Sequence, residues 1–412
     1  MAAMNENNQC LNDLLRRLCP NGVEYKELGE LGSFYGGLTG KSKDDFLDGN
    51  AIFISYRNVY SNPELDIHPI DRVKIAEGEK QRTLKYGDVI FTGSSETPDE
   101  CGFSSVVTTN PTEDLYLNSF CFFLRFDDLS IIDPHFAKHL FRSSDLRYQI
   151  GKTASGVTRF NVSKEKMAKV VIPLPPMEVQ REIVRILDSF TELKAELKAE
   201  LKARKTQYEY YRDRMLKFDD AHPLNAMLHK LCPDGVEYKT LGELSKIERG
   251  TRITKNELIN DGQYNVMSGG TMPMGRYSAA NREADTITIS SYGAAGYVGY
   301  VREEFWANDV CLSVYPLPVV DKKYLYYALK ANQEYIYANT TKAIPDHIPT
   351  KFLLRLSIPL PPMEVQQEIV RILDSFSTLI ESISDGIPAE IEARQQQYEY
   401  YRDKLLQFEK KS

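Results

Sequence analysis

The stretch "IPLPPMEVQREIVRILDSF" at residues 172–190 occurs twice in this chain of 412 residues. Its second copy, "IPLPPMEVQQEIVRILDSF", occupies residues 358–376 and is identical at 18 of 19 positions. In each copy two prolines precede a segment whose apolar residues recur every three or four positions, which is typical of an amphipathic helix that starts just after a proline. The two copies therefore predict two long helices of the same kind.

The duplication extends well beyond this motif. "CLNDLLRRLCPNGVEYKELGEL" at residues 10–31 matches "PLNAMLHKLCPDGVEYKTLGEL" at 223–244 at 15 of 22 positions, and "QYEYYRD" occurs at both 207 and 397. The segments between these motifs, 32–171 and 245–357, have 140 and 113 residues and share little sequence. Two nearly identical frames thus hold two different inserts, a pattern that favours two inserts that recognise different things.

The segment after each Pro-Pro pair predicts an unusually long helix. Apolar and aromatic residues continue a heptad-like seam over residues 183–218 and again over 369–408. Each helix would span roughly 40 residues, or about 60 Å at 1.5 Å per residue, so we expect the two helices to pack on each other. Gly386 and Pro388 predict a kink or a short break in the second helix.

Short runs such as "GDVIFTG", "FCFFLRF" and "DTITISSYG" predict β-strands inside the inserts, and each insert ends in a segment typical of helix. We therefore expect the α+β class, with two globular modules separated by long helices. The expected domains are residues 1–171 (first module with the N-terminal motif), 172–220 (central long helix), 221–357 (second module) and 358–412 (C-terminal long helix, with the kink near 386–388).

A tetrad repeat occupies the middle of the first long helix. The stretch "TELKAELKAELKARK", which begins at Thr191, contains Glu-Leu-Lys-Ala three times. Four residues turn a helix by about 400°, so each repeat moves its leucine about 40° around the helix. Between the Pro-Pro motif and "QYEYYRD" the second copy is longer by four residues, which is one tetrad. Because a tetrad adds about 6 Å and little rotation, the repeat suits a helix whose length is adjustable.

Composition excludes several classes of protein. An apolar content of 42% and a charged content of 26% are ordinary for a globular protein, and a net charge of −7 argues against a simple basic nucleic-acid binder, although a local basic face can coexist with it. No apolar run reaches the roughly 20 residues of a membrane span, and "MAAMNENNQC" does not have the pattern of a signal peptide. The six cysteines form no CxxC pair, which indicates free thiols in a reducing cytoplasm.

Motifs for catalysis are incomplete throughout the sequence. "YGGLTGKS" has Tyr35 where a phosphate-binding loop requires glycine, and Phe136 stands where a zinc protease with the paired histidines His135 and His139 would have glutamate. The Pro-Pro pairs read Leu-Pro-Pro-Met, which is not the loop of a DNA methyltransferase. We find no set of residues that would perform chemistry, and we expect no catalytic residue and no metal ligand.

Polar loops inside the inserts are the remaining candidates for function. They are rich in Gly, Ser, Thr, Arg and Tyr, which contact phosphates and base edges in protein–DNA complexes. Any single one of them could equally be an ordinary surface residue of an α+β domain. The candidate DNA-binding residues are Arg57, Ser94, Ser95, Thr158 and Arg159 in the first insert and Arg249, Thr251, Arg252, Arg276, Tyr292 and Lys342 in the second.

The frame with "IPLPPMEVQ" and a long helix, found twice around two unlike inserts, resembles the specificity subunit of type I restriction–modification enzymes. The resemblance covers essentially the whole chain. One departure is that Val179 and Val365 separate a glutamate and a glutamine that are often adjacent in this motif. The resemblance implies that each insert is a target recognition domain that reads one half of a bipartite sequence in double-stranded DNA, and that the long helices form an antiparallel coiled coil that sets the gap.

The same resemblance implies partners. The subunit would not be catalytic and would bind no cofactor itself. Two methylation subunits would supply S-adenosylmethionine chemistry, and restriction subunits would use ATP and Mg²⁺. Candidate residues for docking these partners are Tyr208, Tyr211, Tyr398 and Tyr401.

Because DNA rises roughly 3.4 Å per base pair, one tetrad would correspond to about one or two base pairs of gap. Two alternatives stay open: a scaffold whose two heads on a coiled coil bind proteins, and a catalytic subunit whose site has no recognisable motif.

Overall fold

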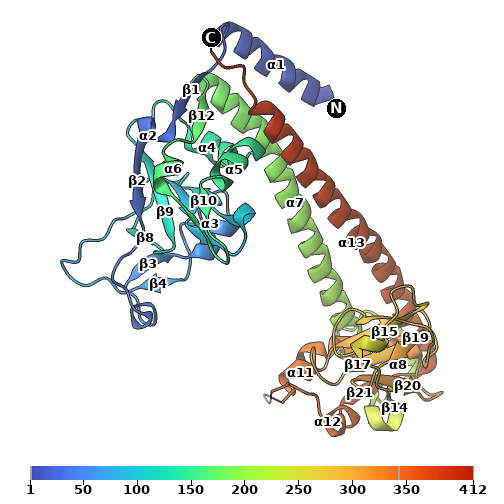
Figure 1. Cartoon of the computed structure of the whole chain (residues 1–412). Coiled ribbons are helices and arrows are strands. Elements are labelled where there is room, and N and C mark those ends of the chain that lie inside the picture. Colours follow the sequence, from blue (N-terminus) through green and yellow to red (C-terminus); the bar gives the residue numbers. More distant parts are fainter. Residues whose placement is uncertain (1, 342–343, 412) are drawn as a thin grey trace. The chain divides into compact units, whose positions relative to one another are not determined.

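The computed structural model describes residues 2–341 and 344–411, without the side chains of residues 2–9 and 378–386. The chain divides into two compact units, which we call unit 1 (Met1–Lys198 with Ala389–Ser412) and unit 2 (Ala199–Pro388). Each unit contains one insert together with parts of both long helices (Figure 1). The class is α+β, as expected.

Unit 1 is built around a four-stranded antiparallel sheet. In spatial order its strands are β2 (Gly32–Gly36), β9 (Cys121–Phe126), β5 (Val89–Thr92) and β7 (Ser104–Val106). Two three-stranded sheets accompany it, one of β4 (Arg72–Val73), β3 (Ala51–Ile54) and β8 (Leu115–Leu117), the other of β10 (Ala154–Ser155), β11 (Phe160–Val162) and β6 (Ser94–Ser95). Strand β9 is buried along nearly its whole length, which explains why its sequence is apolar at every position except Arg125 rather than alternating.

Helices complete the core of unit 1. Phe91 and Phe122 of the central strands pack in one apolar cluster with Phe136 and Phe141, which lie on and directly after helix α4 (Pro134–Leu140). Asp133 caps that helix by accepting a hydrogen bond from His135 N, and proline follows at the first helical position. The helices of the unit outside the long pair are α1 (Ala2–Leu18), α2 (Leu28–Leu31), α3 (Tyr56–Ser61), α4 (Pro134–Leu140), α5 (Ser144–Gly151) and α6 (Lys164–Met167).

Unit 2 repeats the four-stranded sheet and one of the two three-stranded sheets with different side chains. Its four-stranded sheet is β14 (Ser245–Arg249), β20 (Cys311–Pro316), β17 (Thr286–Ser290) and β18 (Val298–Val301), and its three-stranded sheet is β16 (Gly275–Tyr277), β15 (Tyr264–Met267) and β19 (Phe305–Ala307). Its shorter helices are α8 (Asn225–Leu231), α9 (Leu241–Leu244), α10 (Lys322–Ala331), α11 (Gln333–Ala338) and α12 (Thr350–Leu354). The two inserts therefore share a fold although they share little sequence.

The repeated frame forms the same contacts in both units. Strand β1 (Glu24–Glu27) pairs antiparallel with β12 (Val171–Leu174), and β13 (Glu237–Thr240) pairs in the same register with β21 (Ser357–Leu360). The glutamine of the repeated motif explains part of the sequence identity. Gln180 is fully buried, accepts a hydrogen bond from Asp133 N at 2.8 Å, and donates to Ile131 O and Pro175 O, both at 2.8 Å.

Gln366 makes the corresponding contacts in unit 2. It is 1% exposed, accepts from Asp321 N at 2.7 Å, and donates to Val319 O at 3.2 Å and Pro361 O at 2.8 Å. In each unit one side chain therefore joins the module, the Pro-Pro turn and the long helix.

The two long helices differ by one tetrad in length. Helix α7 (Met177–Met215) has 39 residues and α13 (Met363–Leu405) has 43. The pairing within each unit is antiparallel: in unit 1 Phe190, near the start of α7, stacks on Tyr401, near the end of α13, and in unit 2 Tyr211 stacks on Phe376, with ring centroids 5.6 and 5.3 Å apart.

Helix α13 continues through Gly386 and Pro388, so the helix has no break at these residues. The kink expected there stays a prediction. The division of the chain into four segments also stays a prediction, and the two compact units each contain part of both long helices.

The tetrad repeat contributes little to burial. Ile183, Ile186 and Phe190 at the start of α7 are almost fully buried, whereas Leu193 of the first tetrad is 36% exposed and Leu197 is half-buried. The apolar seam is therefore tight next to the module and weak along the tetrads. A segment with so little packing can change in length at small cost.

We expect Gln366→Ala to lower the free energy of unfolding by about 2 to 4 kcal/mol, because it leaves three backbone groups without the partners that satisfy them. Urea unfolding monitored by circular dichroism measures this. The matched control is Gln367→Ala, an exposed neighbour, for which we expect a change within about 0.5 kcal/mol. Equal effects of the two substitutions would contradict the role of the buried glutamine.

Candidate nucleic-acid interface

All five residues predicted from the first insert line one cavity of about 620 Å³ in unit 1. Three segments that are distant in sequence supply them: helix α3, strand β6 and the loop between β10 and β11. The lining residues are Tyr56, Arg57, Tyr60, Ser94, Ser95, Glu96, Glu100, Phe120, Thr158 and Arg159.

Backbone pairing brings these segments together. The chain leaves the central sheet at Gly93, whose N–H donates to Phe120 O at 2.7 Å, and continues into β6. Strand β11 pairs with β6, so that Asn161 lies opposite Ser94. The turn between β10 and β11 is tight, since a Cβ at Gly156 would lie 2.0 Å from Arg159 O. The tip of this hairpin therefore carries Arg159 to the rim of the cavity.

Hydrogen bonds hold the cationic side of the cavity in place. Arg159 Nη2 donates to Ser94 Oγ at 3.3 Å, and its guanidinium lies 5.3 Å from the centroid of the Phe120 ring. Tyr56 donates its hydroxyl to Ser94 O at 2.8 Å. Arg57 and Arg159 are both exposed. Two arginines thus face solvent beside aromatic rings, and Arg159 is preorganised by its contacts.

The opposite side of the cavity is acidic. Glu100 accepts hydrogen bonds from Tyr60 at 3.0 Å and from Ser95 at 3.1 Å. Hydrogen bonds from Tyr60, Ser95 and Thr97 lower the pKa of Glu100, while the hydrogen bond to Glu100 raises the pKa of Tyr60. An ionised carboxylate accepts from cytosine N4, whereas arginine donates to guanine. The cavity therefore offers donors and acceptors suited to base edges, not only cations suited to phosphates.

Unit 2 has an equivalent position with other side chains. Strands β5 and β17 end at equivalent positions of their sheets. Ser94 and Tyr292 each lie two residues after that end, so Tyr292 occupies the place of Ser94. Tyr292 forms a bridge with His347, as Ser94 pairs with Asn161 in unit 1. The Tyr292 ring stacks on the His347 imidazole with centroids 5.4 Å apart, and Thr341 Oγ1 lies 2.7 Å from His347 Nδ1. An aromatic stack thus replaces a serine–asparagine pair.

The other candidates of unit 2 lie on other elements. Arg249 ends β14 and Arg276 lies in β16, whereas Thr251 and Arg252 lie in the loop after β14. The backbone carbonyls of Arg249 and Thr251 accept from Arg282 Nη2 at 2.7 Å and Trp306 Nε1 at 2.8 Å. The side chains of all four are exposed. Lys342 lies outside the described residues.

Sequence reasoning missed the aromatic residues of the unit 1 cavity. Phe120 is 56% exposed although it directly precedes the buried strand β9, and its sequence context suggested a core residue. Tyr56 and Tyr60 are one helical turn apart on α3, with ring centroids 6.2 Å apart. Exposed aromatic faces are surfaces on which bases stack. The one signal in the sequence was the position of this phenylalanine directly after the turn-forming pair Asn-Ser.

The four tyrosines expected to dock partners contact other parts of their own units. Tyr208 OH lies 3.0 Å from Ser377 Oγ, and Tyr398 OH lies 2.8 Å from His139 Nδ1. Tyr211 and Tyr401 form the stacks between the long helices. In each "QYEYYRD" copy the most exposed tyrosine is the one between them, Tyr210 at 64% and Tyr400 at 61%. Docking through the four predicted tyrosines stays a prediction.

None of the helices in the described part of the chain has the length and hydropathy of a membrane span. Nor do the His, Cys, Asp and Glu side chains of the described residues form a group of three or more that could hold a metal ion.

Comparison with known proteins adds independent observations. The family described as "Type I restriction modification DNA specificity domain" matches residues 20–204 and 233–393, that is, once in each half of the chain. The specificity subunit of the type I restriction enzyme EcoR124I/EcoR124II of Escherichia coli is 34% identical over 283 residues, which cover 60% of this chain and 65% of that subunit.

Two solved structures have a similar fold. A type I restriction–modification S subunit from M. genitalium gives a TM-score of 0.51 at 16% identity and covers 93% of this chain and 96% of its own. A chain from a structure of the type I restriction–modification system, described by its complex assembly and conformational transition, gives 0.62 at 19% identity with coverage of 94% and 98%. With both halves of the sequence matched by the specificity domain, the chain belongs to the family of type I restriction–modification DNA specificity subunits.

Proposed function

We propose that this chain reads a bipartite target in double-stranded DNA, with one half-site per unit and a gap set by the long helices. The observation that supports this most directly is the cavity of unit 1, where Arg57, Ser94, Ser95, Thr158 and Arg159 converge. Unit 2 presents Tyr292 and His347 at the position equivalent to Ser94 and Asn161. One scaffold with different side chains suits two different half-sites.

The chemistry of the cavity fits base reading. Arg159 is held by Ser94 and Phe120 so that its remaining N–H groups can donate to guanine O6 and N7. Glu100 can accept from cytosine, and Tyr56, Tyr60 and Phe120 offer apolar contact. Net charge is negative, so phosphate contacts alone would give weak binding. We infer that much of the grip on the DNA backbone comes from partner subunits.

We infer further that the chain is the recognition subunit of a larger cytoplasmic complex. Two methylation subunits using S-adenosylmethionine, and restriction subunits using ATP and Mg²⁺, would supply the chemistry. The duplicated frame supports this, because "IPLPPMEVQ" and "QYEYYRD" occur once in each half and would present two matching faces to two copies of one partner. Selection from a random duplex pool, with and without a methylation subunit, tests the proposal. A split motif with a fixed gap would support it, and no enrichment in either case would favour a protein-binding scaffold.

Arg159→Ala is expected to relax selection at one or two positions of a single half-site by roughly tenfold or more, because a bidentate contact to guanine is worth about 1 to 3 kcal/mol of discrimination. Sequencing of DNA selected by the assembled complex measures this. Arg16→Ala, an exposed arginine of α1 remote from the cavity in sequence, is the control and should leave the motif unchanged. A uniform loss of binding to all DNA would show that Arg159 contacts only phosphate.

Arg252→Ala provides the corresponding variant of unit 2. Its side chain is exposed on the loop after β14. If that loop reads bases, the substitution should relax the other half-site and leave the first unchanged in the same selection experiment. Relaxation of the half-site that Arg159 affects would contradict the assignment of one half-site to each unit.

Deletion of one tetrad, residues 196–199, should shorten the preferred gap by about one or two base pairs and leave both half-sites unchanged, because it removes about 6 Å of helix with about 40° of rotation. The measurement is selection on a library in which the gap varies. Lys198→Ala, which keeps the helix length, is the matched control and should keep the original gap. An unchanged gap in the deletion variant would refute the role of the helix as a spacer.

A further inference from the structure

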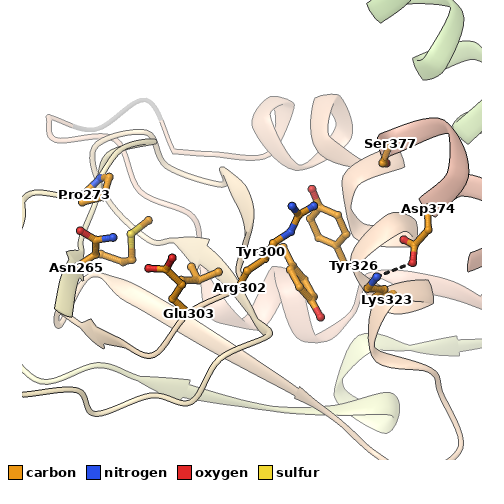
Figure 2. Close-up of a pocket in the computed structure, with 11 residues that line it drawn as sticks. Asn265, Pro273, Tyr300, Arg302, Glu303, Lys323, Tyr326, Asp374 and Ser377 are labelled. Atoms are coloured by element: carbon orange, nitrogen blue, oxygen red, sulfur yellow. Dashed lines mark hydrogen bonds and ion pairs between the residues drawn. The ribbon is translucent and has the colours of Figure 1, made fainter. Parts of the chain in front are cut away.

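A second cavity, of about 520 Å³, lies in unit 2 between the two β-sheets and helices α10 and α13. Figure 2 shows Tyr300, Arg302 and Tyr326 between Asn265 on one side and Asp374 on the other. The residues that line it are Asn265, Met267, Pro273, Tyr300, Val301, Arg302, Glu303, Lys323, Tyr326, Asp374 and Ser377. None of the candidate DNA-binding residues is among them, so this is a different surface.

Strand registers identify the same place in unit 1. Ile287 of β17 and Val89 of β5 occupy equivalent positions in the two four-stranded sheets. Tyr300 of β18 pairs with Ile287, and Val106 of β7 pairs with Val89, so Tyr300 and Val106 are equivalent. By the same count Val301 corresponds to Val107 and Arg302 to Thr108. The parallel pairs β15–β19 and β3–β8 make Asn265 and Met267 equivalent to Ile52 and Ile54.

In unit 1 an extended segment, Pro63–Ile67, fills this place. Val106 N donates to Pro63 O at 3.0 Å, and Leu65 N donates to Val106 O at 2.9 Å, so the segment adds to the free edge of β7. Leu65 and Ile67 belong to one apolar cluster with Ile52, Ile54 and Val107. Three residues that line the cavity in unit 2 therefore correspond to three residues that this segment covers in unit 1.

A carboxylate anchors the segment. Glu64 accepts from Thr108 Oγ1 at 2.7 Å and from Lys138 Nζ at 3.2 Å. Lys138 also pairs with Asp188 of α7 at 2.9 Å, so one ammonium joins two carboxylates. Counted from the capping residues Asp133 and Asp321, Tyr326 of unit 2 takes the place of Lys138, and Lys323 takes the place of His135. Unit 2 nevertheless has a cation here, because Lys323 pairs with Asp374 of α13 at 2.5 Å, and its side chain is 46% exposed (Figure 2).

Among the described residues, no segment of unit 2 fills the cavity, because the connection between β15 and β16 is too short. Seventeen residues join β3 to β4 in unit 1, whereas seven join β15 to β16 in unit 2. The edge of β18 is open as a result. Gln333 and Lys330 bind the N–H and C=O of Val298, but the next outward-facing residue, Tyr300, has no backbone partner among the described residues. An unpaired edge next to a cavity is a template for a further strand.

We propose that this cavity of unit 2 binds an extended segment of a partner protein, which adds a strand to β18. The segment would place a branched apolar side chain against Met267 and Val301 and a carboxylate at Lys323, as Leu65 and Glu64 do in unit 1. Strand addition of this kind takes its affinity from backbone hydrogen bonds and its specificity from alternate side chains. The inference goes beyond DNA reading and does not depend on it.

The chain itself supplies the probe. A synthetic peptide of residues 61–68, "SNPELDIH", should bind the full-length chain saturably at one site in a calorimetric titration, because unit 1 already holds its own copy of the segment. Replacing Glu64 in the peptide by Lys should weaken binding at least tenfold. Absence of saturable binding by the original peptide would overturn the proposal.

Two protein variants locate the site. Lys323→Glu should weaken binding of the peptide at least tenfold, whereas Lys322→Glu, its exposed neighbour on α10, should leave the affinity within about twofold. Equal affinities of the two variants would overturn the proposed site. Sedimentation tests the occupant: self-association of the chain that the peptide reverses would assign the cavity to a second copy instead of a partner protein. DNA selection by Lys323→Glu should be unchanged, which separates this inference from the proposed function.

Discussion

A buried glutamine at the start of each long helix fixes how a variable module joins a constant frame. Gln180 and Gln366 each satisfy the carbonyl of the first proline of the Pro-Pro turn and the N–H of the N-cap residue of the first helix after the sheet. A buried amide that lost these partners would carry the full cost of desolvation. The motif around the glutamine can therefore vary little, whereas the module needs only to present a capped helix in the right place. This constraint explains part of the identity of the motif, 18 of 19 residues, beside inserts that share little sequence.

The aspartate of the same motif shows how the frame accepts different modules. Asp188 contacts Lys138 and His139 in unit 1, and Asp374 contacts Lys323 and Tyr327 in unit 2. Burial alone would raise the pKa of Asp188, but hydrogen bonds and charges from His139 and Lys138 outweigh it and lower that pKa to about 2. Burial lowers the pKa of His139, and its Nε2–H donates to the Asp188 carboxylate, which can only accept. One constant acceptor thus serves two different sets of donors, which is how a frame keeps its sequence while its inserts diverge.

How well the sequence predicts a feature depends on how far apart in the sequence the residues that determine it lie. The duplication, the α+β class and the packing of two long helices on each other follow from repeats and local periodicity, whereas the antiparallel direction of those helices was implied only by the family resemblance. All of these features appear in the structure. The five residues of the first insert were chosen by type and loop position, yet they converge because strand β11 pairs with β6, a register that no local pattern encodes. In unit 2 the same reasoning reached Tyr292 and the loop of residues 339–347, but it did not single out His347, whose partner is 55 positions away in sequence. Phe120 was missed because its neighbours form a buried strand, and Pro388 did not end its helix.

The two units differ most where the frame constrains them least. Their four-stranded sheets and glutamine contacts correspond in strand order and register, whereas the connection after β3 is ten residues longer than the connection after β15. That difference fills a cavity in one unit and leaves it open in the other. The tetrads of α7 obey the same logic along the helix, since Leu193 is exposed while Ile183 is fully buried. Differences in length occur where few buried polar groups would lose their hydrogen-bond partners. Only in such places does adding or removing residues leave the hydrogen bonds of the frame intact.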